Sequence, residues 1–73
     1  MAFQFLALAH RAWLIAKLYK VRRKYEKDPV KLALIDSLIN QLVMARSPPA
    51  YTMALQSLAE AAEVIPELKE LIG

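Results

Sequence analysis

Two proline-containing corners constrain the fold of this chain more than any other feature of its sequence. Asp28 precedes Pro29, and Ser47 precedes Pro48 and Pro49. An Asp or Ser side chain at the N-cap accepts a hydrogen bond from a free N–H of the first helical turn. Proline at the first helical position loses no intrahelical bond, because its N–H would be unpaired anyway. Each corner therefore predicts the start of a helix.

The segments around these corners predict an all-α fold. No segment of the 73 residues alternates with the period of two that a half-buried strand requires. Very short corners force antiparallel neighbours, so we expect an up-down-up three-helix bundle forming a single domain, 1–73. Its helices should span about residues 2–27, 29–46 and 48–72. Pro66 lies inside the last of these and would cost roughly 3 kcal/mol in a straight helix, so we expect this helix to be kinked or broken there.

The second and third predicted helices each have one apolar and one polar face. At helical spacing, the second should bury Leu34, Ile35, Leu38, Ile39, Leu42 and Ala45, and the third Tyr51, Ala54, Leu58, Ala61, Ile65 and Leu68. The first helix follows this pattern only after Lys17, where Leu18, Val21 and Tyr25 oppose lysines.

The front half of the first helix is apolar on more than one side. Between residues 1 and 16 the polar side chains are Gln4, His10 and Arg11 alone. One apolar stripe can face the core, while a second lies well round the helix at about 100° per residue. Counting back from the first corner puts the end of the second helix level with His10, so earlier residues project past it. The second stripe is therefore expected to lie outside the bundle.

This outward stripe is the predicted binding surface. The stripe has the spacing used by helices that lie in a groove of another protein, with aromatic anchors and a rim formed by its histidine and lysines. The predicted partner-binding residues are Ala2, Phe5, Leu6, Ala9, His10, Trp13, Ala16, Lys17 and Lys20. We expect the partner to be another protein, which the sequence does not identify.

Two other partners compete for the same stripe. A second copy of the chain could bury it in a C2 homodimer. A membrane surface ranks third, since Trp13 and the following lysines resemble an interfacial anchor, but most of the basic residues follow the apolar half instead of flanking it.

Catalytic, metal and cofactor sites are not indicated. The chain has no cysteine, one histidine, and a single glycine at its last position, which leaves no thiolate or multi-histidine site and no glycine-rich phosphate loop. We therefore expect a non-enzymatic chain that binds no cofactor.

Nucleic acid is also an unfavoured partner. The basic cluster from Lys20 to Lys24 could contact phosphates, but no aromatic platform lies beside it. Charge complementarity with Glu60, Glu63 and Glu67 of the last helix would explain it without a nucleic acid.

No uncharged run approaches the roughly 20 residues that span a bilayer, and no secretory signal is expected. We expect a soluble chain whose compartment the sequence does not indicate.

The organisation resembles that of de novo designed three-helix miniprotein binders. The resemblance rests on the Asp28-Pro29 and Ser47-Pro48-Pro49-Ala50 corners, the absence of internal glycine, and Leu- and Ala-rich helices joined almost without loops. It covers the architecture of the whole chain, while Pro66 and the low Lys and Glu content depart from the simplest designs. It implies recognition of a target without catalysis and without a natural substrate.

Overall fold

The chain folds into helices throughout the part that the structure describes. The computed structural model describes the backbone of residues 2–72 and the side chains of residues 8–72. Within these limits the elements are α1 (Ala2–Lys24), α2 (Pro29–Met44), α3 (Pro48–Ala61), the 3₁₀ helix η1 (Pro66–Leu68) and α4 (Lys69–Ile72). The predicted all-α class is confirmed.

Both predicted corners start helices as expected. The Asp28 carboxylate accepts a hydrogen bond from the backbone N–H of Lys31 at 3.2 Å, and the Ser47 hydroxyl accepts one from the N–H of Ala50 at 3.3 Å. Both capping residues have extended backbone angles, and proline follows each of them directly. The starts of α2 and α3 are therefore fixed by local chemistry.

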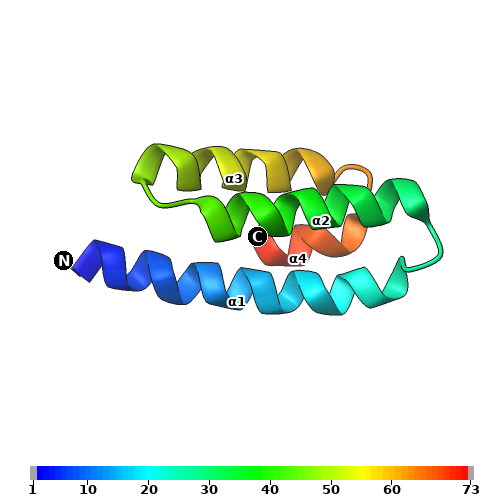
Figure 1. The fold of residues 1–73 in the computed structure, drawn as a ribbon, viewed down its shortest axis with the longest axis horizontal. Coiled ribbons are helices and arrows are strands. Elements are labelled where there is room, and N and C mark those ends of the chain that lie inside the picture. The colour runs from blue at the N-terminus through cyan, green and yellow to red at the C-terminus, as the bar shows by residue number, and fades with distance from the viewer. Residues whose placement is uncertain (1, 73) are drawn as a thin grey trace.

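The three longer helices lie side by side, and the chain reverses direction at each corner (Figure 1). α1 packs against α2, and α2 packs against α3. With 23 residues α1 is about 34 Å long, whereas α2 with 16 residues is about 24 Å long, at 1.5 Å per residue. The first turns of α1 consequently extend past the neighbouring helices (Figure 1).

The core is apolar and draws on every long helix. Its buried members are Leu14, Leu18, Ile35, Leu38, Ile39, Leu42, Ala54, Leu58, Ala61, Ala62, Ile65 and Leu68. Most of the predicted core positions of α2 and α3 are therefore confirmed. Leu34 and Tyr51 are only half-buried, and Ala62 was not predicted.

The C-terminal segment departs from the expected third helix. α3 ends at Ala61, the chain turns, and η1 and α4 return toward the middle of the molecule between α1 and α3 (Figure 1). Ile65, the residue before Pro66, has an extended conformation with φ −119° and ψ 92°. The proline ring disfavours helical angles at that position, so the helix must stop before it.

A helix running to residue 72 is therefore wrong, and a simple up-down-up bundle of three helices is not confirmed. The predicted break near Pro66 occurs, but it is a reversal of the chain with an additional short helix. The reversal brings Leu68 fully into the core.

Candidate protein-binding surface

Arg11 fixes the front half of α1 to the end of α2. Its guanidinium Nη1 donates a hydrogen bond to the backbone carbonyl oxygen of Ala45 at 2.9 Å. Ala45 is the C-cap residue of α2, where carbonyl groups lack intrahelical partners and the helix dipole is negative. The end of α2 thus lies level with Arg11, close to the His10 level predicted from helix lengths.

Three rings meet where α1 passes the start of α3. His10 Nδ1 lies 2.5 Å from the hydroxyl oxygen of Tyr51, and the two rings meet edge to face with centroids 6.1 Å apart. On its other side the His10 ring lies nearly parallel to the Trp13 ring, at 15° and 6.0 Å between centroids. These distances are typical of favourable aromatic pairs. Partial burial raises the pKa of Tyr51, which the nearby Arg11 opposes.

Trp13 is held in place yet remains open to solvent. Its neighbour Leu14 points into the core, and a step of about 100° round the helix turns Trp13 outward. The Trp13 side chain is 44% exposed. The ammonium of Lys17 lies 5.8 Å from the ring centroid, within cation–π range. His10 and Lys17 therefore restrict the indole without covering it.

Most of the predicted binding residues whose side chains the structure describes lie at the surface. Ala9, His10, Ala16 and Lys20 are exposed, and Lys17 is half-buried beside Trp13. The side chains of three further predicted residues, Ala2, Phe5 and Leu6, lie outside the described residues. We define the outer face of α1 as eight of its exposed side chains: Leu8, Ala9, Ala12, Trp13, Ala16, Tyr19, Lys20 and Arg23.

Five residues on or near this surface were missed from the sequence: Leu8, Ala12, Tyr19 and Arg23 of the outer face, and Tyr51 beside it. Leu8 and Tyr19 are 54% and 52% exposed, and helical spacing from Ala12 and Ala16 could have placed both of them on the outer face. Tyr51 was predicted to be buried, but it is the partner of His10. The count of helix lengths that placed His10 level with the second corner could also have predicted that His10 and Tyr51 lie close together.

The basic half of α1 is not neutralised by α3 as predicted. Within residues 8–72 its ion pair is Arg22 with Asp36 of α2, at 2.6 Å. Of the predicted acidic residues, Glu67 on η1 accepts a hydrogen bond from the hydroxyl of Tyr25, the residue directly after the end of α1. This bond lowers the pKa of Glu67, against the effect of burial and with a smaller contribution from Lys24. Glu60 and Glu63 are exposed and form no ion pair among the described residues.

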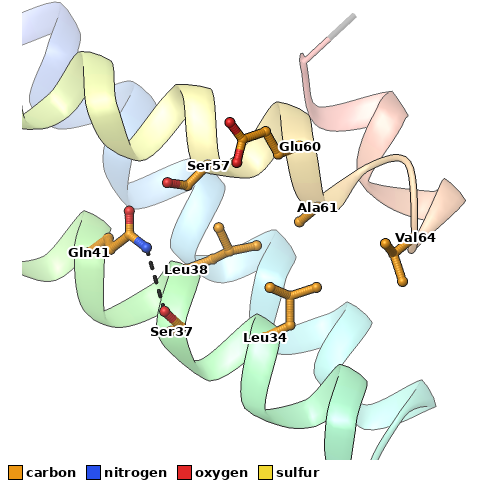
Figure 2. Close-up of a pocket in the computed structure, with 8 residues that line it drawn as sticks. All are labelled: Leu34, Ser37, Leu38, Gln41, Ser57, Glu60, Ala61 and Val64. Carbon is orange, nitrogen blue, oxygen red and sulfur yellow. Dashed lines mark hydrogen bonds between the residues drawn. The ribbon is translucent and has the colours of Figure 1, made fainter.

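A separate shallow groove of about 270 Å³ lies between α2 and α3 (Figure 2). Its floor includes the buried Leu38 and Ala61, and Gln41 donates a 3.5 Å hydrogen bond to the hydroxyl of Ser37 at its edge. The remaining lining residues are Leu34, Ser57, Glu60 and Val64. None of the predicted binding residues lines this groove.

Searches for other kinds of site within the described residues gave two findings. No group of three or more His, Asp or Glu side chains lies close enough to hold a metal ion. None of the helices combines the length and the apolar character needed to cross a bilayer.

The comparisons with known proteins identify no relative. The chain matches no protein-family model, and no curated protein or solved structure is significantly similar to it. The function must therefore be proposed from the outer face of α1 itself.

Proposed function

We propose that this chain is a non-enzymatic protein-binding module that engages another protein through the outer face of α1. In this proposal α1, α2 and α3 form an up-down-up frame, closed at one end by η1 and α4. The frame presents Trp13 as the central anchor, with Ala9 and Ala16 allowing close approach and His10, Lys17 and Lys20 as the polar rim. As the resemblance to designed miniprotein binders implies, recognition is the whole of its activity.

The observation that carries this proposal is the half-exposed indole of Trp13, which has the His10 ring and the Lys17 ammonium beside it. A large aromatic side chain that is already restrained loses little conformational entropy on binding, which favours affinity. Tryptophan is also among the residue types most enriched at the energetic centres of protein interfaces. The parallel His10 ring and the Lys17 ammonium supply that restraint.

The test compares three forms of the immobilised full chain: wild type, Trp13→Ala and Val30→Ala. Val30 is the matched control, because it is a strongly exposed apolar residue at the start of α2, away from the outer face of α1. A protein retained by wild type and by Val30→Ala is purified and titrated against all three by calorimetry. We expect Trp13→Ala to weaken its binding by more than about 2 kcal/mol, or about thirtyfold.

The folded state of each variant is measured separately by urea unfolding. Because the indole is half-exposed, Trp13→Ala should destabilise the fold far less than truncation of the buried Leu14, which is expected to cost about 2–5 kcal/mol. If the captured protein binds Trp13→Ala as tightly as wild type, the proposed function is wrong. If Trp13→Ala unfolds the chain, Trp13→Phe provides the binding comparison.

A further inference from the structure

Two exposed helix faces of this molecule share the same division into an apolar part and a charged part. On the outer face of α1, Trp13 is followed by Lys20 and Arg23. On the solvent side of α3, Met53 is 65% exposed and is followed by the exposed carboxylate of Glu60, and then by that of Glu63 in the turn after the helix ends at Ala61. In both helices the apolar residue comes first along the chain, and the charges have opposite sign.

The spacing of the two sets is identical. In each set the first charge follows the apolar residue by seven positions, and the second charge follows three positions later. At about 3.6 residues per turn the three positions of α1 lie on one side of that helix, as do Met53 and Glu60 on α3. Glu63 lies in the turn directly after α3, where its backbone N–H donates to the carbonyl oxygen of Glu60 at 3.2 Å. Two such helices laid side by side in parallel would therefore match Trp13 with Met53, Lys20 with Glu60, and Arg23 with Glu63.

The fold leaves these charges available. Within residues 8–72 the ion pairs are Arg22 with Asp36 and Lys31 with Asp28, so Lys20, Arg23, Glu60 and Glu63 form none. α1 and α3 lie along opposite long edges of the molecule in the view of Figure 1. Their exposed faces point away from the shared core, so α3 of one molecule can approach α1 of another without displacing α2.

We infer that the partner of the outer face of α1 is a second copy of this chain, bound through the exposed side of its α3. The two helices run parallel, the flexible thioether of Met53 lies against the Trp13 ring, and the basic residues of α1 face the acidic residues of α3. The contact is heterologous, because each copy offers one α1 face and one α3 face, so it propagates into linear assemblies. This inference rests on the proposed function, since it uses the same outer face.

A symmetric contact between two α1 helices has no comparable complementarity. Residues 8–24 contain six Lys and Arg residues and no Asp or Glu, so two α1 faces bring only like charges together. Like charges across an interface oppose association. The α3 face, by contrast, supplies both an apolar contact and the opposite charge in the matching order.

Analytical ultracentrifugation of the full chain tests this inference. At low salt we expect association that grows with protein concentration up to about 1 mM. Raising the ionic strength from about 0.01 M to about 1 M shortens the screening length from about 30 Å to about 3 Å and should weaken it. Trp13 fluorescence should shift to shorter wavelength on association, and Met53→Ala should reduce that shift.

Charge reversal supplies the decisive comparison. K20E/R23E and E60K/E63K should each weaken self-association by about tenfold, because two attractive pairs become repulsive in each variant. An equimolar mixture of the two should associate like wild type, and so should the chain that carries all four substitutions. K27E/R46E, which reverses two exposed charges outside both faces, is the matched control and should leave association unchanged.

Several results would overturn the inference. The inference is wrong if the chain is a monomer at about 1 mM in low salt. It is also wrong if neither K20E/R23E nor E60K/E63K changes the association, or if the equimolar mixture of the two variants does not recover it. A monomer that instead sediments with vesicles of anionic phospholipid would assign the outer face to a lipid surface. If the chain is monomeric and the protein that it captures no longer binds Trp13→Ala, only this inference is overturned. The proposed function then stands.

Discussion

The two ends of this molecule are held together by different physical means. At one end, which we call the proline end, η1 and α4 turn back after Pro66 and bury Leu68 beside α1. At the other, the tryptophan end, α1 is attached through hydrogen bonds from Arg11 to the end of α2 and between His10 and Tyr51 at the start of α3. At the first end this burial is accompanied by the hydrogen bond from Tyr25 to Glu67, and at the second the polar and ring contacts lie beside the buried Leu14.

This difference explains where the molecule can offer a binding surface. The returning η1 and α4 cover the apolar side chain of Leu68 at the proline end, where Val30 and Val64 remain exposed. The tryptophan end has no such segment among the described residues, and contacts on one side of α1 hold the helix while Trp13 stays half-exposed. A helix fixed by a few polar contacts can keep an apolar face in solvent.

The largest effect is expected from Leu68→Ala at the proline end. Leu68 is fully buried, so its truncation removes apolar contacts and leaves a cavity, with an expected loss of about 2–5 kcal/mol. Urea unfolding followed by far-ultraviolet circular dichroism measures it. The control, Ile72→Ala in α4, removes a side chain that is 44% exposed and should cost less than about 1 kcal/mol. Equal losses for the two would show that η1 and α4 contribute as a whole and not through Leu68.

An intermediate effect is expected from Arg11→Ala at the tryptophan end. The substitution removes a charged hydrogen bond to the C-cap of α2, with an expected loss of about 1–2 kcal/mol in the free energy of unfolding. Arg46→Ala in the adjacent corner is the control, because Arg46 is exposed, and it should change stability by less than about 0.5 kcal/mol. A loss larger than that of Leu68→Ala would contradict the distinction between the two ends.

The smallest effect concerns the polar bond at the proline end, from Tyr25 to Glu67. The bond lowers the pKa of Glu67 below its ordinary value of 4.5, so its contribution to stability is present above that pH and is lost as the pH falls through the lowered value. The same bond raises the pKa of Tyr25 above 10, so its contribution is present below pH 10 and is lost as the pH rises through the raised value.

The free energy of unfolding, measured as a function of pH, tests this bond. Tyr25→Phe should flatten the dependence of stability on pH at both extremes, and Glu67→Gln should flatten the acid side. Glu63→Gln controls for the removal of one exposed carboxylate. If wild type and Tyr25→Phe lose stability in parallel on both sides, the bond contributes nothing to the fold in solution.

Local chemistry allowed the sequence to predict much of this molecule. The helix starts at Pro29 and Pro48 could be read directly, because an N-cap side chain and a following proline act within one turn and need no distant contact. The core positions of α2 followed from helical spacing, since the apolar side of each helix must be covered. The outward position of Trp13 followed from the same rule, since Leu14 and Trp13 cannot both face inward.

What only the tertiary structure decided are the contacts between residues far apart in the chain. Pro66 predicted a break, but the direction of the returning segment depends on the space beside α1 that Leu68 fills. The bond from Arg11 to Ala45 and the contact of His10 with Tyr51 depend on how the helices lie in register, which helix lengths fix only to within a turn. Propensity and capping act over a few residues, whereas these contacts form only once the long helices have packed together.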